Sequence, residues 1–241
     1  MDLRIGHLYP DLMSIYGDRG NVLALTQRAR WRGIDVETRP FTVGTAFEAD
    51  WPDVWFFGGG QDQGQDIVGA DLAGANGAAL RRSLEGGAAA FTVCGGYQLL
   101  GHEYVPENAP AIPGLGVIDV RTRAGRQRFV GNLVADTPDG QLVGFENHSG
   151  RTYLGPDAKP LGTVVVGHGN NGEDKTEGAV QGKIIGTYSH GSCLPKNPWL
   201  ADRLLGWALE RRHGAVRLIP LDDREENAAR DQAAAVARAR P

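Results

Sequence analysis

Short apolar runs alternate with longer amphipathic stretches over the first hundred residues of the chain. Four of these runs have the length and composition of strands, at residues 3–8, 34–38, 54–57 and 88–93. Two intervening stretches carry apolar residues at helical spacing, at residues 21–32 and 78–84. This alternation predicts an α/β fold with a mostly parallel central sheet, flanked by helices and binding ligands at the carboxyl ends of its strands.

Beyond residue 114 the pattern changes to strands separated by turns. Five such segments are present, at residues 115–121, 129–135, 142–145, 163–167 and 183–188, and they predict antiparallel additions to the sheet. Residues 198–212 then form an apolar helical stripe, and the run from residue 222 is charged and rich in alanine. We therefore predict one domain over residues 1–221 and a tail over 222–241, either a solvated helix or a disordered end.

The composition narrows the possible classes of protein. The chain has 241 residues, long enough to bury a core around a pocket, and a formal net charge of -4, which argues against a nucleic-acid partner. No apolar run is long enough to span a bilayer, and the start of the chain lacks the apolar segment of a secretory signal. Only two cysteines are present, so no disulfide framework is indicated. We expect a cytoplasmic protein without a transmembrane segment.

One cysteine, Cys94, stands where an apolar run stops abruptly. Gly95 and Gly96 follow it, and a short amphipathic segment comes next, so the pattern predicts a strand, a tight turn and a helix. Such an elbow exposes the thiol beside the positive end of a helix dipole, which favours the reactive thiolate. The alternative is a small buried core residue, but a cysteine inside a strand needs no glycine pair after it.

A thiol that attacks a carbonyl needs a base. Among six histidines, His190 follows a predicted strand and would project from its end. His148 and His168 also lie on turns that contain glycine, so position alone favours His190 only weakly. Each of the three could instead simply bond to loop backbone.

Three blocks make a family resemblance specific: GGGQD at 58–62, CGGYQ at 94–98 and GTYSHG at 186–191. In this order and at these separations they resemble triad-type class I glutamine amidotransferases, in the branch related to cobyric acid synthase. Within that branch the chain is similar to the glutaminase subunits of lipid II isoglutaminyl synthases. Further supporting blocks lie at residues 16–21, 144–152, 167–171 and 194–197. The resemblance covers nearly the whole chain and implies a flavodoxin-like fold.

The resemblance also implies roles for individual residues. Cys94 would attack the side-chain amide of L-glutamine, and His190 would protonate the departing ammonia and then activate water. Backbone amides of Gly95 and of the Gly59–Gly60 turn would hold the oxyanion. Arg128 matches the position that holds the substrate, and a guanidinium suits its α-carboxylate. The neighbouring arginines, at 121, 123 and 126, are alternatives to it.

One departure from the family pattern concerns the third member of the triad. Many triad glutaminases carry an acidic residue two positions after the histidine, whereas Gly191 and Ser192 follow His190 here. An orienting carboxylate must then come from elsewhere. Glu146 is the candidate within the chain, and we expect a partner subunit to supply the acid instead.

The partner implied by the resemblance is a MurT-like Mur ligase, which would amidate the D-glutamate of lipid II with the released ammonia. This chain has no phosphate-binding loop of the GxxxxGK[ST] type, so we expect no cofactor on it and place ATP and Mg on the partner. Two alternatives remain open. The chain could serve another synthetase, such as a corrinoid amidase, or it could be an inactive binding or regulatory subunit with a misplaced His190.

Overall fold

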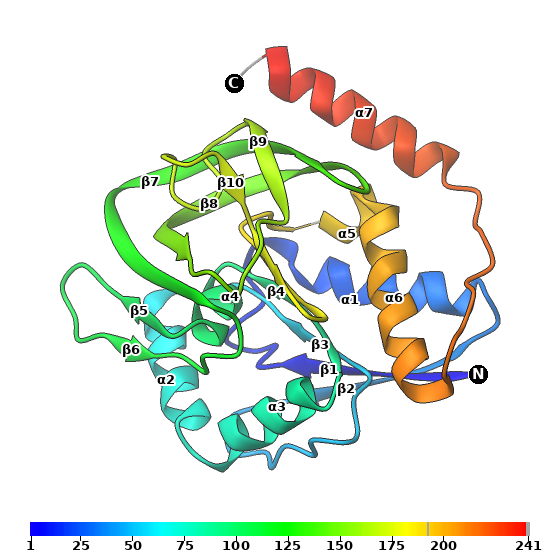
Figure 1. The fold of residues 1–241 in the computed structure, drawn as a ribbon, viewed down its shortest axis with the longest axis horizontal. Helices are drawn as coiled ribbons and strands as arrows, with labels where there is room; N and C mark the ends of the chain where they lie inside the picture. The colour runs from blue at the N-terminus through cyan, green and yellow to red at the C-terminus, as the bar shows by residue number, and fades with distance from the viewer. Residues whose placement is uncertain (192, 240–241) are drawn as a thin grey trace.

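The computed structural model describes residues 1–191 and 193–239 and has a central sheet of six strands in the order β11-β12-β4-β3-β1-β2 (Figure 1). Its strands are β1 (Asp2–Leu8), β2 (Asp35–Phe41), β3 (Val54–Phe57), β4 (Ala89–Val93), β11 (Ala179–Gln181) and β12 (Ile184–Thr187). All neighbours pair in parallel except β11, which runs antiparallel to β12. The predicted mostly parallel sheet is confirmed, and the catalytic candidates follow its strands β4 and β12.

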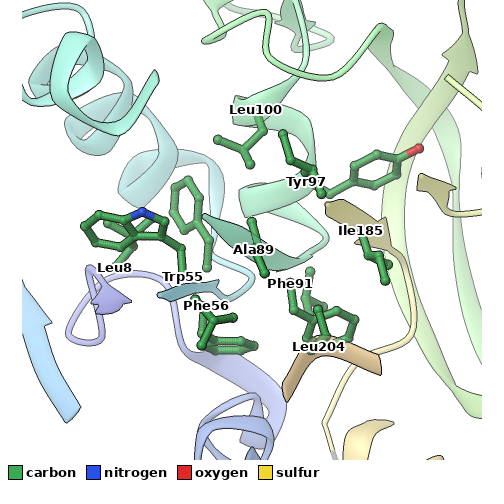
Figure 2. Packing of buried hydrophobic residues seen from close by; sticks show 14 of the residues in the cluster. Leu8, Trp55, Phe56, Ala89, Phe91, Tyr97, Leu100, Ile185 and Leu204 are labelled. Carbon is green, nitrogen blue, oxygen red and sulfur yellow. The ribbon is translucent and has the colours of Figure 1, made fainter. Parts of the chain in front are cut away.

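Apolar side chains on both faces hold this sheet between two layers of helices. β3 and β4 are buried throughout, because helices cover both of their faces. Figure 2 shows Phe56 and Phe91 on the side where Leu204 packs, and Tyr97 and Leu100 on the other side. The larger side chains in this cluster are almost fully withdrawn from water, which supplies most of the driving force for folding.

One face of the sheet is covered by α1 (Arg19–Arg30) and α6 (Pro198–His213), and the other by α2 (Asp62–Leu72), α3 (Ala75–Glu85) and α4 (Gly95–Leu100). The short α5 (Cys193–Lys196) packs against α1 and α6. Helix α1 begins at Arg19, two residues before the stretch predicted at 21–32, and Asp18 occupies its N-cap position. The pattern missed α2 altogether, because two glycines and many polar residues dilute its apolar face.

A second sheet contains the segments predicted as strands at 129–135, 142–145 and 163–167, whereas 183–188, predicted as an antiparallel addition, contains β12 of the central sheet and pairs in parallel with β4. It has the order β10-β9-β7-β5-β6, with β8 paired to β7, and its strands are β5 (Glu103–Val105), β6 (Ile112–Pro113), β7 (Val120–Thr137), β8 (Gly140–Leu154), β9 (Gly162–Val166) and β10 (Thr176–Glu177). β7 and β8 form one long hairpin, whose register shifts between Ala124 and Phe129. Residues 125–128 therefore bulge out of the ladder.

The charged, alanine-rich tail forms helix α7 (Arg224–Ala239), which lies beside the second sheet (Figure 1). Its other side is exposed, but Ala234 and Ala237 are buried in a small cluster with three valines of the sheet, Val134, Val143 and Val166. Of the two expected states, the structure therefore has a helix, and that helix is packed along one face rather than solvated all round. Within residues 1–191 and 193–239, no helix combines the length and the apolar character that a membrane span needs.

Candidate active site

The turn at Cys94 is the strained elbow that the sequence predicts. Cys94 has φ 49° and ψ -106°, a backbone conformation that residues other than glycine rarely adopt. Its N–H donates to the Thr187 carbonyl at 2.9 Å. A Cβ on Gly95 would lie 2.6 Å from Nε2 of Gln65, and a Cβ on Gly96 would lie 2.6 Å from the Phe57 carbonyl oxygen. The glycine pair is therefore required by close packing, and it leaves the Cys94 thiol on the wall of a cavity.

His190 lies beside Cys94, just past the end of β12. Its N–H donates to the carbonyl of Phe145 in β8 at 2.8 Å, so the second sheet fixes its backbone. A Cβ on Gly59 would lie 2.6 Å from Cε1 of His190 and 3.3 Å from Cβ of Cys94, which places all three residues together. The structure therefore does not have the misplaced His190 that the alternative of an inactive binding or regulatory subunit requires.

Electrostatics favour the protonated form of His190. Burial is the largest single effect and lowers the pKa of this imidazole, but the neighbouring Cys94 and Asp18 outweigh it and raise the pKa to about 10. An imidazolium beside a thiolate is the charge state in which a cysteine nucleophile is ready to attack and a proton is ready for the leaving group.

The carboxylate next to His190 is Asp18, at the start of α1. Its Oδ1 lies 3.4 Å from Nδ1 of His190 and accepts the N–H of Gly191 at 2.9 Å, while its Oδ2 accepts the N–H of Gly59 at 2.8 Å. Asp18 is fully buried. Sequence reasoning named Asp18 only as part of the family-like block at 16–21. Its position after β1, at the carboxyl edge of the sheet where Cys94 also lies, is the signal that could have identified it.

Glu146, the candidate within the chain for this role, has other partners. Its carboxylate accepts the backbone N–H of His168 at 2.8 Å and that of Gly169 at 2.9 Å, and Nδ1 of His168 lies 2.9 Å away. Burial alone would raise the pKa of Glu146, but the neighbouring imidazoles of His148, 3.7 Å away, and His168 outweigh burial and lower the pKa. Glu146 is therefore an ionised anchor for the 167–169 turn, and the carboxylate of the described chain that lies beside His190 is Asp18.

The cavity beside Cys94 has a volume of about 430 Å³ and carries Arg128 on its wall, together with Gln98, Asn147 and His148. Arg128 donates from Nε to Oδ1 of Asn147 at 2.5 Å and from Nη2 to the Asn147 carbonyl at 3.1 Å. Neither of the arginines at 121 and 123 lines the cavity: one approaches Glu103 and the other covers Tyr153. The structure thus brings Arg128, rather than those two, to Cys94.

The three glycines expected to hold an oxyanion are placed differently from one another. Gly60 lines the cavity, and Gly95 opens α4, where the first amides of a helix have no acceptor within it. The amide of Gly59 donates to Asp18 instead of facing the cavity, so the prediction that it holds the oxyanion is wrong. Gly59 contributes space, because a side chain there would displace the imidazole of His190.

A buried cysteine on an elbow, a histidine and a carboxylate around a polar cavity define a cysteine-dependent amide hydrolase site on a glutamine amidotransferase fold. Residues 4–198 match the family model of the CobB/CobQ-like glutamine amidotransferase domain. The chain belongs to this family.

Two curated relatives span nearly the same length. The subunit GatD of the glutamine-hydrolysing lipid II isoglutaminyl synthase from Staphylococcus aureus is 39% identical over 96% of this chain and 93% of the relative. The subunit of the same name from Streptococcus pneumoniae is 40% identical over 90% of this chain and 85% of the relative. A cobyric acid synthase from Pelotomaculum thermopropionicum is 36% identical, but over only 57% of this chain and 29% of that protein.

Solved structures support the fold at lower sequence identity. PurLQS from Thermotoga maritima superimposes with a TM-score of 0.57 at 14% identity, covering 87% of this chain and 99% of that one. A crystal structure of a glutamine amidotransferase gives a TM-score of 0.53 at 19% identity, covering 86% of this chain and 97% of that one. The class I amidotransferase fold that the resemblance implies is therefore confirmed.

Proposed function

We propose that this chain hydrolyses L-glutamine as the glutamine-hydrolysing subunit of a lipid II isoglutaminyl synthase. The observation that carries the proposal is the meeting of Cys94, His190 and Asp18 at the wall of a cavity that also holds Arg128. The full-length similarity to the two GatD subunits favours this acceptor over a corrinoid, because the cobyric acid synthase matches this chain with less than a third of its length.

The reaction follows from the positions of these side chains. The Cys94 thiolate attacks the side-chain amide carbon of glutamine, and the carbonyl electrons move onto oxygen, beside the amides of Gly60 and Gly95. The tetrahedral intermediate collapses to a thioester as the His190 imidazolium gives its proton to the departing ammonia. The neutral imidazole then takes a proton from water, which attacks the thioester and releases glutamate. The raised pKa of His190 suits its first task, since it holds the proton that ammonia needs.

Arg128 supplies recognition rather than chemistry. Its guanidinium lies on the cavity wall, where it can bind the α-carboxylate of a free amino acid through two hydrogen bonds. Asn147 already fixes the guanidinium on one side, so little side-chain freedom remains to be lost when the substrate binds. This pre-organisation favours free glutamine over a glutamine side chain within a peptide, which has no α-carboxylate.

The ammonia is used by a second protein in this proposal. Both GatD relatives are named as subunits, which supports a heterodimer with a MurT-like Mur ligase. That partner would bind ATP and Mg and would amidate the D-glutamate of lipid II to D-isoglutamine, while this chain needs no cofactor for amide hydrolysis. Because activation of the acceptor uses ATP, we place the complex in the cytoplasm.

Co-purification tests the choice of acceptor. The full chain is used as bait, and the bound protein is identified and assayed for amidation of lipid II with L-glutamine as the nitrogen source. Recovery of a Mur-ligase-like protein and glutamine-dependent amidation are expected. Recovery of a corrinoid synthetase, with amidation of a corrinoid, would assign the chain to the alternative acceptor.

A further inference from the structure

Arg128 lies in the irregular part of β7, where the strand leaves its hydrogen-bonded ladder. We propose that His168 and Arg151 are positioning residues that hold this bulge, and with it the guanidinium of Arg128, over the substrate cavity. The inference rests on the proposed glutamine-binding role of Arg128 and gives a function to a histidine that the mechanism leaves unused.

Arg151, on β8, fills the space under the bulge. Its Nη2 donates to the Gln127 carbonyl at 2.6 Å, and its Nη1 donates to the Ser149 carbonyl at 2.9 Å, so it ties the residue before Arg128 to the neighbouring strand. A Cβ on Gly125 would lie 2.8 Å from Cζ of Arg151, which shows how closely the bulge wraps around this guanidinium. The backbone of residues 125–128 is thereby held although it lacks ladder partners.

The ring of Phe129, next to Arg128, is clamped between two flat groups. The guanidinium carbon of Arg151 lies 3.4 Å from the ring centroid, and the imidazole of His168 stacks on the ring with centroids 4.0 Å apart and planes 12° apart. Two groups this close cannot share one face of a ring, so Arg151 and His168 lie on opposite faces. Cation–π and stacking contacts of this kind fix the ring plane.

His168 is itself held in place by Glu146. The carboxylate lies 2.9 Å from Nδ1 of His168 and accepts its backbone N–H, and it is fully buried on β8. Asn147, the next residue on β8, accepts two hydrogen bonds from Arg128. Two consecutive residues of β8 therefore act on the bulge: Asn147 holds Arg128 directly, and Glu146 holds the His168 ring that stacks on Phe129.

This arrangement makes a specific kinetic prediction. If His168 acts through Arg128, its loss weakens capture of the α-carboxylate and raises KM, while the distances among Cys94, His190 and Asp18 stay the same and kcat is preserved. A role confined to stability would lower the melting temperature and the amount of active protein without changing KM.

The test measures glutamine hydrolysis by the full chain, with its partner where one co-purifies, in a double-mutant cycle of His168→Ala and Arg128→Ala. We expect His168→Ala to raise KM about tenfold with kcat within about twofold, the equivalent of about 1.4 kcal/mol in binding. His168→Phe, which keeps a flat ring over Phe129, should recover most of the affinity. In the Arg128→Ala background, His168→Ala should change KM no further.

His102→Ala is the matched control, because His102 is also a partly exposed histidine, 2.9 Å from the carboxylate of Asp119, whereas the histidine stacked on Phe129 is His168. His102→Ala should leave KM unchanged. A full additional rise in KM from His168→Ala in the Arg128→Ala background would overturn the inference, as would an unchanged KM in His168→Ala alone. An unchanged KM in Arg128→Ala would instead overturn the proposed role of Arg128, and the inference with it.

Discussion

Oδ1 of Asp18 lies 3.4 Å from Nδ1 of His190, although 172 residues separate the two in the chain. The N–H groups of Gly59 and Gly191 donate to the carboxylate and hold it in this position before any partner or substrate binds. Although no acid follows His190 in the sequence, Asp18 places a carboxylate of this chain beside the imidazole, next to Cys94.

Replacing Asp18 tests whether this carboxylate orients His190. We expect Asp18→Asn to lower kcat for glutamine hydrolysis by about 100-fold or more, because the imidazole loses the partner that fixes its tautomer and stabilises its charge. Steady-state ammonia release measures the effect. Asp66→Asn, at an exposed position on α2, should leave kcat unchanged. Wild-type kcat in Asp18→Asn would show that the orienting acid comes from elsewhere, the partner included.

Gly59 provides the space in which the His190 ring sits. In Gly59→Ala the new methyl group would lie 2.6 Å from Cε1 of the imidazole, so the ring must move away from Cys94. A misplacement of about 1 Å costs on the order of 100-fold in rate, and we expect a loss of this size with the fold retained. Circular dichroism and ammonia release measure the two properties. Gly206→Ala in α6 meets open space and should change neither, and an active Gly59→Ala enzyme would contradict the packing of the site.

The buried carboxyl of Glu177 should make the free energy of unfolding depend on pH. Its fully buried carboxyl lies between Thr187 Oγ1 and the N–H of Tyr188, and burial, the largest effect, raises its pKa from 4.5 to about 7. Between these two values the folded chain keeps a proton that the unfolded chain has lost, so this group makes stability fall as pH rises from about 4.5 to about 7.

Glu177→Gln removes the titrating proton. The free energy of unfolding of the variant relative to wild type should therefore increase with pH across this window, by about 3 kcal/mol at most, and level off above it. Urea titrations at several pH values give the difference. A difference that is constant with pH would contradict the raised pKa of Glu177.

Arg28 anchors the start of the C-terminal helix to the body of the protein. It is 3% exposed and forms ion pairs with Asp202 at 2.7 Å and Asp223 at 2.6 Å. Arg28→Ala removes the cation of Asp223 and leaves Asp202 with Arg32 as its cation, and it should reduce the free energy of unfolding by about 3 kcal/mol. Arg224→Ala breaks a fully exposed pair with Asp222 and should have no measurable effect on unfolding. Equal melting temperatures for the two variants would contradict the anchoring role of Arg28.

The parts of the site that local signals mark could be predicted from the sequence. Cys94 is marked by an apolar run that ends in two glycines, and His190 by the end of a strand, because each signal lies within a few residues. Asp18 has no such local mark: it joins His190 only because β1 and β12 end at the same edge of one sheet. The prediction for Gly59 is wrong because a sequence does not distinguish a glycine required by close packing from one whose amide binds an oxyanion.

The second sheet was predicted less completely for a related reason. Its longest strand, β7, contains the polar run from Arg121 to Arg128, which breaks the alternation that identifies a strand. Pairing with β8 and the guanidinium of Arg151 hold this run in place, and both contacts are made by residues distant in sequence. The same polar run carries Arg128, so the segment that is hardest to predict is part of the substrate cavity.

In the proposed reaction Cys94 forms a covalent bond to the side-chain amide carbon of glutamine with the help of His190. Mass spectrometry of the intact chain, after incubation with a glutamine analogue that carries an electrophilic carbon at the side-chain position, tests it most directly. We expect one adduct, mapped to Cys94, absent from Cys94→Ala, suppressed by L-glutamine and formed more slowly in His190→Ala. Labelling of Cys94→Ala to the same extent as wild type, together with undiminished ammonia release from L-glutamine, would contradict it.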